Sequence, residues 1–239
     1  QAGAPVVELG RGELADNITL GRSGSSAALS LQVVRGADTQ ILTTPDVIVD
    51  RTWMHVAVSI SSGSPTIYVN GVAKASKTNG PQGPDFTPAA GVGRSKSYLG
   101  KSSRELPLFK GRLADVRLWR RARALDEIVA DMNGSLMLDD PALVANYRLD
   151  ETDGLRAFDA SYAQLDADVR GMKALWGAPS PAMLPSANQA GCLNFNGTSD
   201  WVELPAFTFA PFTPGFSATF TLEAWVNFES TGAYSRILE

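Results

Sequence analysis

Carboxylates are the side chains of this sequence whose type and spacing could most directly carry out a reaction. Retaining glycosidases, for example, place two of them ~5 Å apart, often at alternate positions of one strand. The sequence has no Glu-x-Asp-x-x-Glu segment, and its acidic groups at 139–140 and 150–153 fall at expected strand ends or in loops. Solvated turn residues are the commoner interpretation of such groups, so they do not predict a glycosidase.

Histidine and cysteine chemistry is limited to one residue of each type. His55 is the only histidine, which excludes a two-histidine metal site, and its place beside Trp53 in an expected strand favours a structural role over that of a general base. Cys192 is the only cysteine, which excludes an intrachain disulfide and a cysteine-based zinc site. No nucleophile with a base and an orienting acid is apparent. We therefore expect a protein that is not an enzyme.

Basic residues are concentrated in one segment of an acidic chain. Residues 94–123 contain ten basic residues against two acidic ones, whereas the whole chain has a net charge of −4. The overall charge argues against generic nucleic-acid binding. A basic face on an acidic protein can attract polyanions such as sulfated or uronic glycans. The alternative is a set of solvated charges that point in several directions.

Short runs of alternating apolar and polar residues, separated by turn residues, dominate the sequence. Such alternation predicts a half-buried strand over 53–60 and a long sandwich strand over 218–228, the second in a central position of its sheet. The Asn70-Gly71 pair between two apolar runs predicts a tight hairpin, because both residues tolerate the positive φ angles of a type I′ turn. These patterns indicate an all-β protein.

Helix and membrane-spanning segments are scarce. Apolar residues recur at helical spacing most clearly over 124–133, where Asp126 and Glu127 favour the first turn. No apolar run approaches the ~20 residues of a membrane helix, so we expect no membrane insertion. With 239 residues the chain can form one large domain or two small ones.

Five motifs follow one another between residues 53 and 128. They are Trp53-Met54-His55-Val56-Ala57, Tyr68-Val69-Asn70-Gly71, Tyr98-Leu99-Gly100-Lys101-Ser102, the run from Phe109 to Trp119, and Asp126-Glu127-Ile128. In this order they resemble the C-terminal half of laminin-G-like domains of the concanavalin A type, and pentraxins share the closing pattern. The resemblance implies a two-sheet antiparallel jelly-roll sandwich with one short helix.

The remainder of the chain resembles the opposite half of the same family. Its motifs cover 143–151, 193–204 and 220–226, so that segment 1–140 resembles the C-terminal half and segment 141–239 the N-terminal half. The halves then stand in permuted order, either within one sandwich or because the chain comes from tandem repeats.

A half sandwich leaves an open sheet edge and an uncovered apolar face. We therefore expect the two segments to complete one another, within one chain or by strand exchange between two chains, with residues 237–239 beside 6–9. Two unrelated small β domains are the alternative.

The resemblance to pentraxins also raises the question of calcium. Asp16-Asn17 resembles the pair that supplies calcium ligands there, but the second ligand segment after Leu99-Gly100 carries Lys101 and Arg104 where acids are expected. Calcium takes about six to eight oxygen ligands. The resemblance therefore implies no required cofactor and at most one weak calcium site at Asp16, Asn17 and Glu105, with a turn-capping role for Asp16 as the alternative.

Related domains place their ligand site at the rim of the sandwich, which directs attention to Lys101 and Arg104 and to the nearby Lys96 and Arg94. The resemblance implies a non-catalytic recognition module for a carbohydrate or a protein, within a larger secreted or surface protein such as a bacterial adhesin or toxin. We expect these four residues to bind an anionic glycan without calcium. A structural spacer repeat is the alternative from another class, and a degenerate glycosidase is a third.

Overall fold

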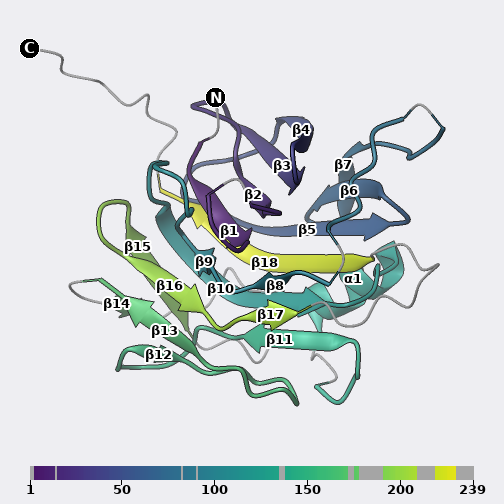
Figure 1. Cartoon of the computed structure of the whole chain (residues 1–239). Helices are drawn as coiled ribbons and strands as arrows, with labels where there is room; N and C mark the ends of the chain where they lie inside the picture. Colours follow the sequence, from purple (N-terminus) through teal and green to yellow (C-terminus); the bar gives the residue numbers. More distant parts are fainter. Residues whose placement is uncertain are drawn as a thin grey trace, which may run out of the picture.

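The computed structural model describes residues 3–13, 15–81, 83–89, 91–134, 138–171, 175–177, 191–208 and 219–229. Within these ranges, two antiparallel sheets form the body of the molecule and one short helix lies against it (Figure 1). The predicted all-β sandwich with one helix is confirmed.

The first sheet has eight strands. In spatial order they are β12 (Arg156–Ala157), β13 (Ala167–Arg170), β16 (Trp201–Leu204), β9 (Ser97–Leu99), β1 (Pro5–Leu9), β2 (Ile18–Arg22), β3 (Ala28–Arg35) and β4 (Asp38–Asp46).

The second sheet also has eight strands. Seven follow in the order β14 (Leu175–Gly177), β15 (Cys192–Asn196), β10 (Lys110–Trp119), β18 (Phe220–Phe228), β5 (Trp53–Ser61), β6 (Ser64–Val69) and β7 (Val72–Ser76), and β11 (Leu143–Tyr147) pairs with β10. A small third sheet joins β8 (Gly93–Arg94) to β17 (Phe207–Thr208).

The core lies between the two sheets, where alternate residues of each strand meet. Leu31 of the first sheet and Val58 of the second belong to this one cluster and are fully buried. Phe109 packs edge-on against Phe195 and Phe228, with ring centroids 5.6 and 5.5 Å apart. Each large apolar side chain buried in this way stabilises the fold by roughly 1.5–3 kcal/mol.

Both faces of the central strands are buried, which corrects the expectation of a half-buried strand at 53–60. All nine residues of β18 and eight of the nine residues of β5 are buried. The outer face of the second sheet carries a second apolar cluster that includes Trp53, Trp225 and Met132, the last from helix α1 (Leu125–Asn133). The helix therefore covers part of this face.

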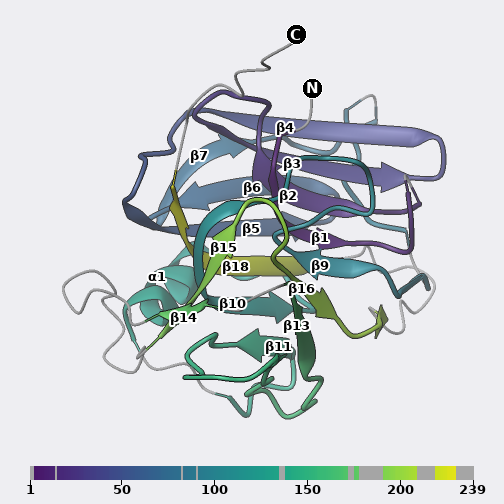
Figure 2. The same ribbon diagram turned by 90° about the vertical axis from the view of Figure 1, so that its left-hand side faces the viewer.

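Strands from both segments of the chain build both sheets (Figure 2). β18 pairs with β10 on one side and with β5 on the other, β16 pairs with β9, and β15 pairs with β10. One sandwich is thus closed within one chain. The permuted order relative to the family stays a prediction, and the proposed contact of residues 237–239 lies outside the described residues.

Local predictions of turn and helix are confirmed. Asn70 and Gly71 connect β6 to β7 with φ angles of 50° and 72°, as a type I′ turn requires. The predicted helix at 124–133 is α1, and the predicted central strand is β18.

Candidate functional site

One buried carboxylate holds the loop 100–106 onto the outer face of the first sheet. Glu8 lies in β1 between two core residues, so its side chain points away from the core. Its carboxylate accepts hydrogen bonds from Ser102 Oγ (2.5 Å), Ser103 N (2.8 Å), Ser103 Oγ (2.6 Å), Thr19 Oγ1 (3.3 Å) and Asn17 Nδ2 (3.4 Å). Five donors around one carboxylate satisfy a charge that would otherwise be costly to bury.

The carboxylate of Asp16, the first of the expected calcium ligands, is bonded to other groups of the chain. It has a φ angle of 53°, and its Oδ1 accepts a hydrogen bond from Gly36 N (3.0 Å). Its Oδ2 lies 3.2 Å from Arg11 Nε. Both carboxylate oxygens are therefore occupied by partners from the chain.

The other two expected ligands do not join Asp16 around a common point. Asn17 directs its amide nitrogen, a donor, at Gly12 O (2.8 Å) and Ser103 Oγ (3.2 Å). Glu105 is exposed. Within the described ranges no group of three or more acidic, histidine or cysteine side chains could hold a metal. These residues do not fit the oxygen cluster that calcium requires.

Lys101 and Arg104 lie on the same loop, but each is held by the first sheet. Lys101 Nζ is 4.0 Å from the centre of the Trp201 ring and 5.3 Å from that of Tyr98. Arg104 Nη2 donates a hydrogen bond to Gln32 Oε1 at 2.9 Å. A cation over an aromatic face is attracted to it by about 0.5–2 kcal/mol. Both cationic groups are thus already engaged, and ligand binding by them stays a prediction.

Lys96 and Arg94 have opposite environments. Lys96 is exposed, whereas Arg94 is fully buried and donates to the carbonyl oxygens of Val92 and Ala89 (both 3.3 Å). Burial lowers the pKa of Arg94 to about 10. The four expected binding residues therefore do not form one exposed surface.

Several charges of the basic segment 94–123 are paired with acidic side chains. Arg121 binds both carboxylate oxygens of Glu127, at 2.9 and 2.7 Å, and this lowers the pKa of Glu127 to about 2. Arg123 lies over the Trp119 ring, 4.0 Å from its centre, and pairs with Asp131. The positive charges of this segment point in several directions.

The acidic groups considered for catalysis hold turns. Asp140 Oδ1 accepts a hydrogen bond from Ala142 N at 2.7 Å. Asp150 pairs with Arg148 at 2.7 Å, and Glu151 Oε1 accepts from Phe158 N at 2.7 Å. Each of these carboxylates has a partner within the chain.

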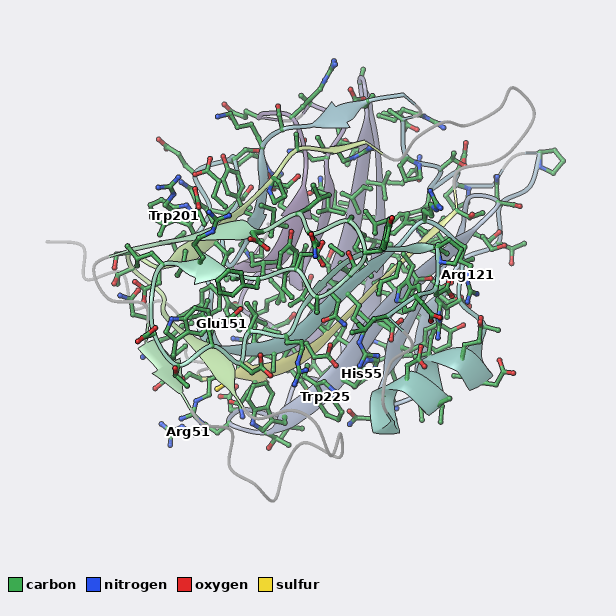
Figure 3. All side chains as sticks on the ribbon, turned by 90° about the horizontal axis from the view of Figure 1, so that it is seen from below. Arg51, His55, Arg121, Glu151, Trp201 and Trp225 are labelled. Carbon is green, nitrogen blue, oxygen red and sulfur yellow. The ribbon has the colours of Figure 1, made fainter. Side chains whose placement is uncertain are left out.

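A buried polar cluster joins the central strands of the second sheet. Glu223 Oε2 lies 3.4 Å from His55 Nε2 and 3.9 Å from Arg117 Nη1, and Arg117 also pairs with Asp115. The His55 ring packs edge-on against Trp225, with centroids 5.4 Å apart (Figure 3). All four ionisable side chains are at most 6% exposed. The cluster is closed to a substrate and links β5, β10 and β18.

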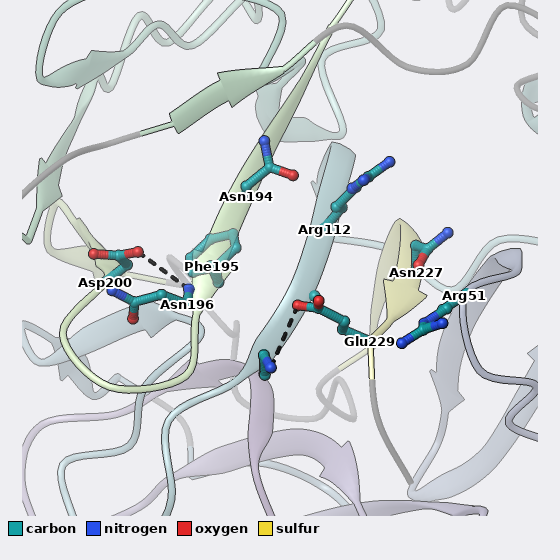
Figure 4. Close-up of a pocket in the computed structure, with 10 residues that line it drawn as sticks. Arg51, Arg112, Asn194, Phe195, Asn196, Asp200, Asn227 and Glu229 are labelled. Carbon is teal, nitrogen blue, oxygen red and sulfur yellow. Dashed lines mark hydrogen bonds and ion pairs between the residues drawn. The ribbon is translucent and has the colours of Figure 1, made fainter.

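An open pocket of about 470 Å³ lies beyond this cluster on the same sheet (Figure 4). Its lining includes Arg112 of β10, Asn194 and Asn196 of β15, Asn227 of β18 and Arg51 from the connection between β4 and β5. The volume is in the range of ~300–1,000 Å³ typical of small-molecule sites.

The register of four strands creates this pocket. Arg112 lies opposite Asn194 of β15 and opposite Asn227 of β18, which in turn lies opposite Trp53 of β5. Directly opposite residues share a face of the sheet, so these side chains form one row on its outer face. Gly111 (φ 149°) allows β10 and β18 to approach closely beside the pocket, since a Cβ there would lie 2.2 Å from Asn227 O.

Sequence reasoning missed both the pocket and Glu8. A signal for the pocket was present in the second face of the strand at 218–228, where Glu223, Trp225 and Asn227 alternate with apolar residues. Polar and aromatic residues on the outer face of a central strand are candidates for a binding surface.

A family model described as the concanavalin A-like lectin/glucanases superfamily, Laminin_G_3, matches residues 4–129, which is more than half of the chain. The match includes Arg51 and Arg112 but ends before Asn194 and Asn227. Neither a curated protein nor a solved structure matches the chain. Among the described residues, no helix is long and apolar enough to cross a membrane.

Proposed function

The chain belongs to the concanavalin A-like lectin/glucanase superfamily, and from that premise we propose that it is a recognition module that binds a carbohydrate without transforming it. The observation that carries the proposal is the open pocket on the outer face of the second sheet. Members with laminin-G-like domains are commonly extracellular, and we propose a secreted or surface location for this one.

The chemistry of the pocket lining suits sugar hydroxyl groups. Asn194 and Asn227 contribute side-chain amides, each with a donor and an acceptor end, whereas both ends of the Asn196 amide bind Thr198 and Ser199 of its own turn. A hydroxyl group likewise donates and accepts, so amides and hydroxyls pair in several orientations. The basic side chains at the pocket add further donors.

The placement of the carboxylates supports binding without catalysis. Asp115 and Glu223 of the sheet are buried and both face Arg117. In the pocket, Asp200 accepts hydrogen bonds from Asn196 N and Ser199 Oγ (both 3.1 Å). The other carboxylate at the pocket, that of Glu229, pairs with Lys110 at 3.8 Å. These carboxylates are held by structural partners, whereas a glycosidase needs an acid and a second carboxylate that face the scissile bond.

The experiment is a binding screen of the purified protein against neutral and acidic oligosaccharides, followed by calorimetry. Replacing Asn194 and Asn227 by alanine removes two amides, each worth roughly 0.5–1.5 kcal/mol, so we expect affinity to fall about tenfold or more. The matched control is the double reversal Lys101→Glu with Arg104→Glu on the first sheet, which should leave affinity unchanged.

The site would have to be placed at the loop 100–106 if a sugar kept its affinity for the double asparagine variant. The same sugar would then have to lose its affinity for the variant with Lys101→Glu and Arg104→Glu. Absence of binding to every sugar in the screen would refute carbohydrate recognition. Melting temperatures of all variants are compared with that of the wild type, so that loss of binding is not confused with loss of fold.

A further inference from the structure

We infer that the pocket on the second sheet selects a sugar that carries a single carboxylate, a uronic acid, over the corresponding neutral sugar. The inference rests on the proposed function and names the ligand class. It follows from the charges around the pocket and from which of them are already paired.

Two of the three basic side chains at the pocket are available to a ligand. Lys110 Nζ lies 3.8 Å from Glu229 Oε2 and is paired with it. Arg112 and Arg51 are exposed, and neither has a side-chain hydrogen bond or ion pair to any residue within the described ranges. Their guanidinium groups are therefore the unpaired charges of the pocket.

Both arginines are positioned by the sheet. Arg112 lies between Asn194 and Asn227 in the cross-strand row. The main chain of Arg51 is fixed to the end of β18, because its N–H donates a hydrogen bond to Phe228 O at 2.7 Å. In Figure 4 the two arginines lie on the same side of the pocket, with Asn227 between them.

This arrangement matches a carboxylate beside hydroxyl groups. A guanidinium group binds a carboxylate through two parallel N–H donors, and such charge-assisted hydrogen bonds are about twice as strong as neutral ones. The amide of Asn227, which lies beside Arg112 in the pocket lining, can pair with the hydroxyl groups of the same sugar ring. One ligand can then engage both kinds of group.

The charge balance favours one negative charge over many. Arg51, Lys110 and Arg112 face Asp200 and Glu229, which leaves one positive charge in excess. A polysulfated chain would bring several charges close to the two carboxylates and be repelled by them. A uronic acid, with its single negative charge, neutralises this one excess positive charge.

The test measures binding of the methyl glycosides of glucuronic, galacturonic and mannuronic acid, each beside its neutral parent hexoside and the 6-sulfate of that hexoside. Ligand-observed NMR and calorimetry are suited to weak binding. For wild-type protein we expect at least one uronide to bind about tenfold more tightly than its neutral parent. Raised salt should weaken the uronide and leave the neutral sugar unaffected, because salt screens charge interactions.

Two single variants test the two pocket arginines, and a third variant serves as the control. Arg112→Gln and Arg51→Gln should each remove most of the preference for the acid while the neutral sugar still binds. Arg120→Gln removes the same charge from an exposed residue just beyond the far end of β10 and should leave the preference intact.

Equal affinity for uronide and neutral parent in the wild type would overturn this inference and leave carbohydrate recognition standing. Tighter binding of a 6-sulfate or a heparin oligosaccharide than of every uronide would overturn the choice of a carboxylate. If Arg120→Gln lost as much of the preference for the acidic sugar as Arg112→Gln, the preference would come from a long-range charge effect and not from contact between Arg112 and the carboxylate. Binding of none of the sugars would refute both the inference and the proposed function.

Discussion

Replacing Glu8 by glutamine perturbs the anchor of the loop 100–106 with almost no change of shape. The carboxylate accepts five hydrogen bonds of 2.5–3.4 Å, from Ser102, Ser103, Thr19 and Asn17. Hydrogen bonds to a charged acceptor contribute roughly 1.5–3 kcal/mol each and neutral ones roughly 0.5–1.5, so the change weakens each by about 1 kcal/mol. Relief of the buried charge offsets part of this loss. We expect a net cost of about 3 kcal/mol.

For a chain of this size, about 3 kcal/mol corresponds to a fall in melting temperature of about 6–12 °C. Differential scanning calorimetry measures it, with Glu105→Gln as the control because Glu105 is an exposed carboxylate of the same loop. Release of the loop should also speed trypsin cleavage after Lys101 and Arg104. A Glu8→Gln variant that melts within about 1 °C of the wild type, with unchanged cleavage, would refute the anchoring role.

Three further outcomes are expected. Leu222→Asp should unfold the protein or lower its free energy of unfolding by several kcal/mol, because Leu222 is 2% exposed in the central strand β18. A melting curve like that of the wild type would contradict the placement of that strand. Glu127→Gln should lower the melting temperature at pH 7. The folded-state pKa of Glu127 is lowered to about 2 from its ordinary 4.5, so the difference in melting temperature from the wild type should shrink as pH falls below 4.5 and vanish near pH 2. A difference in melting temperature that persists near pH 2 would contradict the stabilising pair with Arg121. Millimolar calcium, compared with a chelator, should leave the melting temperature unchanged, whereas a rise lost on replacing Asp16, Asn17 or Glu105 would demonstrate a site.

The elements with a strong local signal could be predicted from the sequence. The Asn70-Gly71 hairpin, the helix at 124–133 and the strand at 218–228 depend on turn chemistry and periodicity within a few residues. The family motifs added the sandwich architecture. These predictions needed no knowledge of which strands are neighbours.

The site could not be predicted because it depends on long-range register. The row Asn194, Arg112 and Asn227 comes from three strands whose order in the sheet is not written in any local pattern. Glu8 stands out as an acid between apolar residues, but the two serines that it anchors, Ser102 and Ser103, are 94 and 95 residues away in the sequence. Burial of Arg94 likewise depends on how its segment packs.

Chemical-shift mapping by NMR tests the central claim, that the pocket on the second sheet binds a saccharide, most directly. The side-chain amide groups of Asn194, Asn196 and Asn227 give signals distinct from those of the backbone. Titration with the sugar that binds best should shift these three signals and the backbone amides of Gly111 and Arg112, with the loop 100–106 unchanged. Shifts confined to Lys101, Arg104 and their neighbours, with the three asparagine signals unmoved, would contradict the account.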